Sequence, residues 1–122
     1  MQIKDRLRKK FFLRRKKNYF DIKPNFFNPL FKLIEKKYNK KSINLSSYYP
    51  ASFEVNVLNL FEKSMAKKLK TLLPVIADND LMYFYKWEKN DVLQINKFGM
   101  LEPTSFSNHV VPNVMLVPLL AY

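Results

Sequence analysis

Residues 114–122 constrain the fold most strongly, because the sequence VMLVPLLAY is apolar over a length typical of one β-strand. A strand buried on both faces of a parallel sheet has this composition, whereas a strand with one solvated face alternates polar and apolar residues. The run therefore predicts an α/β fold, which we expect to be a three-layer, Rossmann-like sheet with flanking helices. Because no sequence follows Tyr122, we also expect the sheet to be incomplete at the C-terminus.

Helix-like and strand-like patterns alternate along the rest of the chain. Ile3, Leu7 and Phe11 recur at helical spacing, and Ser52 is predicted to cap a helix whose first turn contains Glu54. In chain order we predict helices over 2–18 and 29–38, a strand over 42–48, a helix from 54, strands over 70–76, 81–87 and 92–95, a loop over 96–113 and a final strand from 114. Residues 42–76 are thus expected to form one βαβ unit.

The composition excludes several classes of protein. With no cysteine and a single histidine, His109, the chain can form neither a disulfide framework nor a thiolate or paired-histidine metal site. No early apolar segment resembles a secretory signal, and the terminal run is too short for a membrane span, which needs roughly 20 residues. We therefore expect a cytoplasmic monomer without a membrane partner, comprising one partial α/β domain over residues 1–122.

The net charge of +12 is concentrated at one end of the chain. Residues 1–41 hold 15 of the 22 Lys and Arg but 3 of the 10 Asp and Glu, so this basic helical segment carries the whole excess, and the α/β body, 42–122, is neutral. A patch of this kind attracts polyanions such as nucleotide phosphates, polycarboxylates or nucleic acid. The alternative is a solvated lysine-rich surface in a compositionally biased proteome, which the 18 Lys against 4 Arg fit equally well.

The cationic face of the first helix is a candidate anion-binding site. At about 100° per residue, Lys4, Arg8 and Arg15 fall within roughly 40° of one another, beside the apolar stripe. All four arginines of the chain lie on this helix, and the planar guanidinium suits bidentate contacts with phosphate or carboxylate. A solvated amphipathic helix without a ligand is the alternative interpretation.

Glu54 and a set of large apolar side chains are further candidates. Glu54 follows a strand and a turn, a position where α/β proteins often place ligand-contacting side chains, although it could instead only complement a helix dipole. A binding site for a flat aromatic ligand could be lined by Met82, Phe84, Trp87 and Phe98. In strands, however, Met and aromatic side chains more often belong to the hydrophobic core. The sequence contains no Gly-rich phosphate loop, nucleophile elbow or metal cluster, so the catalytic residues stay unknown.

Taken in order, these segments resemble the 5-formyltetrahydrofolate cyclo-ligase family, also called methenyltetrahydrofolate synthetase. The resemblance spans nearly the whole chain and is carried by KDRLR at 4–8 with Arg14 and Arg15, YYPASFEVN at 48–56, LPV at 73–75, MYFY at 82–85, FGMLEP at 98–103 and VMLVPLLAY at 114–122. In the family, a K-x-x-L-R segment on the opening helix contacts ATP, and a glutamate after the first strand holds the folate. The family continues with a Gly-rich phosphate-binding stretch and a metal-contacting carboxylate, neither of which is present here.

The resemblance implies an enzyme that uses ATP and Mg²⁺ to convert 5-formyltetrahydrofolate to 5,10-methenyltetrahydrofolate, with release of ADP and phosphate. It implies ATP binding by Lys4, Asp5, Arg6, Leu7 and Arg8, and reduced-folate binding by Arg8, Glu54, Met82, Phe84 and Trp87. The metal ligands and catalytic residues are expected beyond residue 122, so we expect an N-terminal portion with little activity alone. The alternative is a small basic nucleic-acid-binding protein. Against this alternative, the basic helix lacks interleaved aromatic residues on which bases could stack.

Overall fold

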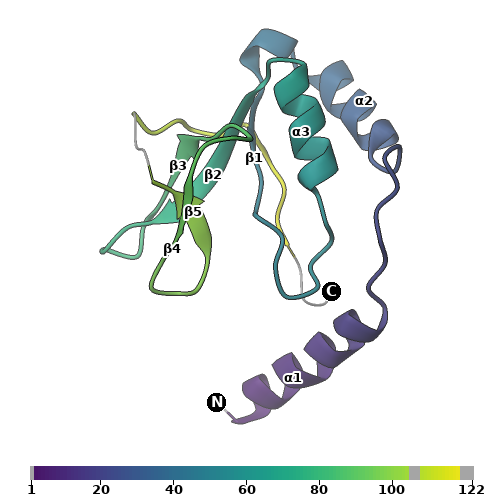
Figure 1. The fold of residues 1–122 in the computed structure, drawn as a ribbon, viewed down its shortest axis with the longest axis vertical. Coiled ribbons are helices and arrows are strands. Elements are labelled where there is room, and N and C mark those ends of the chain that lie inside the picture. The colour runs from purple at the N-terminus through teal and green to yellow at the C-terminus, as the bar shows by residue number, and fades with distance from the viewer. Residues whose placement is uncertain (1, 105–107, 119–122) are drawn as a thin grey trace.

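The chain forms an α/β fold built on a four-stranded, mostly parallel sheet flanked by helices (Figure 1). The structure is a computed structural model that describes residues 2–104 and 108–118. Its helices are α1 (Gln2–Lys17), α2 (Asn28–Lys37) and α3 (Leu58–Ala66), with a short 3₁₀ helix η1 (Lys40–Ser42). Its strands are β1 (Asn44–Ser46), β2 (Lys70–Ile76), β3 (Met82–Lys86), β4 (Leu93–Ile95), β5 (Leu101–Pro103) and β6 (Val114–Met115). The predicted α/β class is confirmed.

β1 lies inside the larger sheet, whose strand order is β3-β2-β1-β6. It pairs in parallel with β2, with Leu45 opposite Thr71, and α3 makes the crossover, so the predicted βαβ unit is confirmed. β6 joins the other side of β1 in parallel, and Asn113 Oδ1 fixes its start by accepting a 2.8 Å hydrogen bond from Asn44 N. β3 runs antiparallel to β2 because only the short turn 77–81 separates the two strands.

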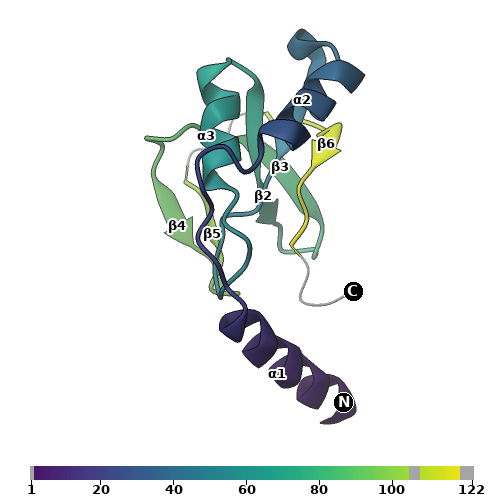
Figure 2. The same cartoon turned by 90° about the vertical axis from the view of Figure 1, so that its right-hand side faces the viewer.

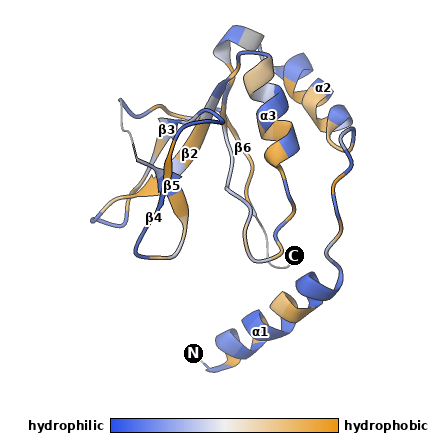
Figure 3. Cartoon of the chain, viewed as in Figure 1, coloured by the Kyte–Doolittle hydropathy of each residue, from blue (hydrophilic) through white to orange (hydrophobic). Residues whose placement is uncertain are grey.

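The core is a single buried cluster in which α2 and α3 pack with the sheet. Its members come from α2, α3 and the segments around β1, β2 and β3, and they are Phe31, Ile34, Ile43, Leu45, Leu60, Phe61, Leu69, Leu73 and Trp87. The Trp87 ring stacks on Phe61, with centroids 5.7 Å apart and planes 8° from parallel. By contrast, α1 contributes no buried residue and is mostly hydrophilic (Figure 3). None of the helices in the described part of the chain has the length and apolarity that crossing a membrane requires.

The start of α3 differs from the prediction. Ser52 and Phe53 have φ angles of 50° and 63°, a left-handed conformation that interrupts a helix, so α3 begins only at Leu58. Asn56 supplies the local hydrogen bond instead, its Oδ1 accepting from Leu58 N at 3.0 Å. The predicted Ser52 cap is therefore wrong, and Glu54 lies in a turn between β1 and α3 rather than in the first turn of the helix.

The region predicted as loop over 96–113 contains the strand β5. It pairs antiparallel with β4 and forms a separate two-stranded hairpin. Gly99, with φ of 74°, takes the left-handed conformation at the turn, and Asn96 Oδ1 accepts hydrogen bonds from two backbone N–H groups there. β5 follows Gly99 closely and ends at Pro103, and both residue types are typical of loops, so the pattern predicted a loop there.

The terminal strand begins where predicted but is less buried than expected. β6 starts at Val114, while 50% of Met115 and 62% of Val117 are exposed. β6 forms an edge of the sheet in the described residues, so its outward side chains lack a covering layer there. The prediction of burial on both faces is therefore wrong for 114–118, and residues 119–122 lie outside the described residues.

Replacing Leu60 by alanine should strongly destabilise the fold, because Leu60 of α3 is fully buried at 0% exposure. The expected loss in the free energy of unfolding is about 2–5 kcal/mol. Leu33→Ala in α2 is a matched control, since Leu33 is 60% exposed and its loss should change stability by less than about 0.5 kcal/mol. Urea unfolding followed by circular dichroism compares the two, and equal losses would contradict the packing of α3.

Candidate functional site

The carboxyl ends of the parallel strands define one edge of the sheet, and two charged segments meet beyond it. The loop 47–57 leaves the carboxyl end of β1, and α1 lies beyond the same edge in both views (Figures 1 and 2). Open α/β sheets form their ligand crevices at this edge. Loop 47–57 and α1 are therefore the candidate site.

Loop 47–57 is held in a defined turn by its own polar groups. Glu54 Oε1 accepts a 3.0 Å hydrogen bond from Ala51 N, and Glu54 N donates to Ala51 O at 2.9 Å. The Tyr48 hydroxyl spans the loop by donating to Val55 O at 2.6 Å. The second carboxylate oxygen, Glu54 Oε2, has no hydrogen-bond partner among the described residues. This oxygen is available to a ligand while the first oxygen fixes its position.

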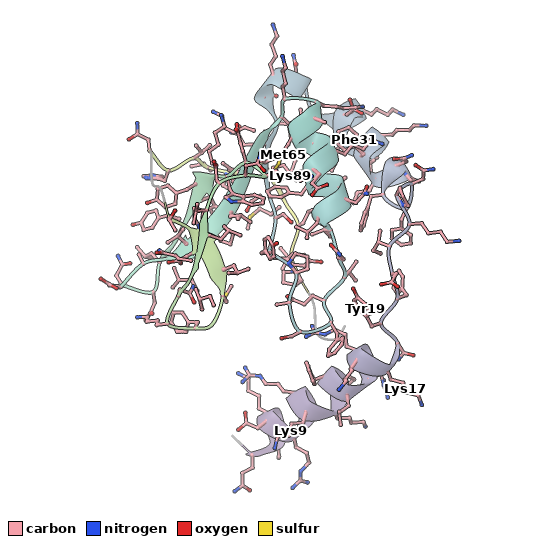
Figure 4. All side chains as sticks on the ribbon, viewed as in Figure 1. Lys9, Lys17, Tyr19, Phe31, Met65 and Lys89 are labelled. Atoms are coloured by element: carbon pink, nitrogen blue, oxygen red, sulfur yellow. The ribbon has the colours of Figure 1, made fainter. Side chains whose placement is uncertain are left out.

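The last turns of α1 contact this loop. Arg15 Nη2 donates a 2.7 Å hydrogen bond to Ser52 O. The Phe53 ring meets Phe12 at 6.0 Å and Tyr19 at 5.8 Å between centroids, both in edge-on geometry. Figure 4 shows Tyr19 between α1 and the loop. We call these contacts of Phe12, Arg15 and Tyr19 with Ser52 and Phe53 the α1 junction.

Charges from both sides of the α1 junction act on Tyr48. Burial raises the pKa of Tyr48 above its ordinary value of 10.0, the Glu54 carboxylate raises it further, and Arg15 partly offsets both effects. The hydroxyl, the carboxylate and the guanidinium therefore lie within electrostatic range of one another. Arg15 Nε is also buried and lacks a hydrogen-bond partner within the described residues. A buried N–H without an acceptor costs about 1–3 kcal/mol, so this position favours an oxygen atom of a ligand or of water.

A cavity of about 270 Å³ lies against the loop. Its walls come from the loop, the start of α3 and the residue after α1, and are Tyr19, Pro50, Ala51, Ser52, Phe53, Glu54, Asn56 and Leu58. A larger cavity of about 830 Å³ lies at the amino-terminal end of β2, away from the carboxyl edge. Charged groups in the walls of the larger cavity already pair with each other, as Lys86 with Glu88 at 3.3 Å and Lys89 with Glu62 at 3.6 Å. Its position at the carboxyl edge of the sheet therefore favours the cavity of about 270 Å³ as the candidate site.

The predicted ATP-binding segment lies exposed on the amino-terminal half of α1. Arg8 pairs with Asp5 at 3.8 Å, but the two side chains are 61% and 65% exposed, so this ion pair is weak. At 1.5 Å per residue, Arg8 and Lys4 lie roughly 10 and 16 Å along the axis from Arg15, on the same helical face. That face is the one that Arg15 turns toward the loop. ATP binding by Lys4, Asp5, Arg6, Leu7 and Arg8 stays a prediction.

The three predicted wall residues of the folate site differ in their exposure and in their position along β3. Met82 is 49% exposed at the start of β3, and Phe84 is half-buried in the same strand. Trp87 is only 5% exposed and belongs to the core, which agrees with the alternative that large apolar residues in strands are core. Trp87 also lines a cavity of about 290 Å³, whose other aromatic walls are Tyr49 and Phe61. Folate binding by Met82, Phe84 and Trp87 stays a prediction.

Tyr48 of the site had no role assigned from the sequence, and Arg15 was part of the predicted anion-binding face without a predicted contact with the loop. Arg15 shares a helical stripe with Lys4 and Arg8, which was its only individual signal, and Tyr48 belongs to the segment that carries the family resemblance. Their proximity to Glu54 depends on tertiary packing that no local pattern reports. Within residues 2–104 and 108–118, no three His, Asp or Glu side chains gather as metal ligands. The described residues therefore form no site that would hold Mg²⁺ by protein side chains alone, and none of them is assigned to the ion.

No model of a known protein family matches the sequence, and no curated protein matches it. Among solved structures, the chain is similar to the NMR structure of Aquifex aeolicus 5,10-methenyltetrahydrofolate synthetase, with a TM-score of 0.58 and 24% sequence identity. The similarity covers 94% of this chain and 60% of the Aquifex chain. At this identity it shows a shared fold. It agrees with the family resemblance at that level and lends no support to the alternative of a nucleic-acid-binding protein.

Proposed function

We propose that this chain belongs to an ATP-dependent 5-formyltetrahydrofolate cyclo-ligase, which forms 5,10-methenyltetrahydrofolate and releases ADP and phosphate. The observation that carries the proposal is the α1 junction, because it brings a cationic helix to the loop that holds the free Glu54 oxygen. Both reactants, ATP and a folate with a glutamyl tail, are anionic, so a cationic surface beside the folate site favours binding them together. The fold shared with the Aquifex synthetase supports the same assignment.

The cations of α1 fit a nucleotide site. Lys4 has no ion pair in the described part of the chain, and Arg8 has only its exposed contact with Asp5. Both side chains therefore have N–H donors available for phosphate oxygens. ATP would supply the phosphoryl group that activates the formyl oxygen of the folate. The role of the α1 residues is to hold the nucleotide and offset its charge.

Glu54 would orient the folate. Its Oε1 is fixed by Ala51 N, so Oε2 is held in place to accept an N–H group of the pterin without a large loss of side-chain freedom. Carboxylates accept stronger hydrogen bonds than amides do, because the acceptor is charged. The substrate-binding role of this residue thus depends on its ionised form.

Glu54→Gln should raise the KM for 5-formyltetrahydrofolate by roughly tenfold, the loss of about 1.5 kcal/mol expected for a charge-assisted hydrogen bond. The KM for ATP should change much less, because the amide still accepts from Ala51 N and keeps the loop in place. Methenyl formation is followed by absorbance on the protein expressed from its complete reading frame. Glu88→Gln, at an exposed carboxylate of the larger cavity, is the control. Equal rises in both KM values would remove Glu54 from the folate site.

Lys4→Ala should weaken the use of ATP and leave the use of folate nearly unchanged. The expected rise in the KM for ATP is roughly two- to fivefold, which corresponds to about 0.5–1 kcal/mol for a solvent-exposed ion pair. Lys9→Ala is the matched control, since Lys9 lies about 140° around α1 from Lys4. An identical effect of the two substitutions would show that α1 acts only through its total charge and that Lys4 has no particular contact.

A further inference from the structure

The α1 junction suggests a role for Arg15 that goes beyond anchoring a helix. We propose that Arg15 is a positioning residue that couples α1 to loop 47–57, so that a nucleotide bound along α1 and a reduced folate bound at Glu54 increase each other's affinity. The inference rests on the proposed function, and it adds a contact through which binding of one ligand changes the affinity for the other.

The loop is strained where Arg15 contacts it. Ser52 and Phe53 are consecutive non-glycine residues with φ angles of 50° and 63°. Side-chain-bearing residues adopt this region reluctantly, and such conformations persist only where surrounding contacts hold them. Arg15 Nη2 provides one such contact at Ser52 O, next to the Ala51–Glu54 turn. Holding Ser52 therefore also holds the backbone from which Glu54 projects.

The side-chain contacts of Phe53 also involve α1 and the residues just after it. Its ring meets Phe12 of α1 and Tyr19, which follows α1, and Lys16 Nζ lies 5.5 Å from its centroid. Every ring or cation contact recorded for Phe53 in the described residues thus comes from the end of α1 or the residues just after it. A movement of α1 would release both strained residues at once.

The contacts of the α1 junction are few, so ligand binding can change the fraction of molecules in which α1 is docked on the loop. No residue of α1 is buried, and α1 is joined to α2 only by the segment 18–27. One hydrogen bond and a few ring contacts give only a modest free-energy preference for the position in which α1 is docked on the loop. A ligand that binds more tightly to the docked form increases that preference. A ligand that binds better when α1 is docked must stabilise the loop, and a ligand that needs the ordered loop must stabilise docked α1 to the same extent.

Arg15 is better suited to this coupling than its neighbour Arg14. Arg15 donates a hydrogen bond to the loop and lies over Phe12 at 5.8 Å, whereas Arg14 lies over Phe11 at 5.3 Å and makes no hydrogen bond or ring contact with the loop within the described residues. The two arginines carry the same charge on the same turn of α1. Arg14→Ala therefore matches Arg15→Ala in charge and helix propensity and differs in the contact alone.

Hydrogen exchange without ligand tests the contact. In the absence of ligand, Arg15→Ala should speed exchange of the Ala51 and Glu54 amide protons by roughly tenfold, because opening of the loop becomes easier. Arg14→Ala should leave both rates within about twofold, and Arg15→Lys, which keeps the charge and one donor, should fall between them. Equal rates in the Arg14 and Arg15 alanine variants would overturn the positioning role.

Ligand binding tests the coupling. The dissociation constant for 5-formyltetrahydrofolate is measured with and without a non-hydrolysable ATP analogue on the protein from its complete reading frame. The analogue should tighten folate binding by roughly fivefold or more in the unsubstituted protein and in Arg14→Ala, and by less than about twofold in Arg15→Ala. A retained coupling in Arg15→Ala would overturn the inference. Absence of binding by either ligand to the unsubstituted protein would reject the proposed function and the coupling with it, even if the exchange result stands.

Discussion

The parallel pairing of β1 with β2 on one side and β6 on the other is the interaction on which the site depends. It aligns the carboxyl ends of three strands at one edge, and the α3 crossover packs over the pair with Leu60 and Phe61 buried against Leu45 and Leu73. Because the end of β1 is fixed by partners on both sides, the loop that follows it starts from a rigid point. The rigid strand end, rather than any property of the loop itself, puts Glu54 at the edge where α/β proteins bind ligands.

The chain separates a neutral packed body from a charged helix that packs poorly. α1 carries nine basic residues and one acidic residue, and this density of like charge opposes close packing against any surface without counter-charge. The contacts that α1 does make use its apolar and guanidinium atoms, on Phe53 and on the Ser52 carbonyl oxygen. An anionic ligand between α1 and the body would lower the repulsion within the helix. The composition of α1 is thus poorly explained by structural packing.

Most of the body could be predicted from the sequence, because its elements have strong local signals. The strand β2 was predicted at Lys70–Ile76 from its apolar run, and α1 and α2 were placed within a residue or so of their ends. The errors at Ser52, Phe53 and Asn96–Leu101 fall where left-handed backbone and side-chain-to-backbone bonds replace periodicity, and the predicted burial of 114–118 was a further error. Glu54 could be singled out from its position after a strand, whereas the contact of Arg15 with the loop could not. That contact joins residues 37 positions apart and depends on how a nearly unburied helix is oriented.

The two cavities show why size alone does not locate a site. The larger one lies at the amino-terminal end of β2, and the charged groups in its walls include two exposed and therefore weak ion pairs, Lys86 with Glu88 and Lys89 with Glu62. The cavity of about 270 Å³ has Glu54 in its wall, and the second carboxylate oxygen of Glu54 has no hydrogen-bond partner among the described residues. A ligand there can donate a hydrogen bond to this oxygen without displacing an existing one. A free carboxylate oxygen on a loop with left-handed backbone at Ser52 and Phe53 is therefore a stronger physical argument for a ligand site than cavity volume alone.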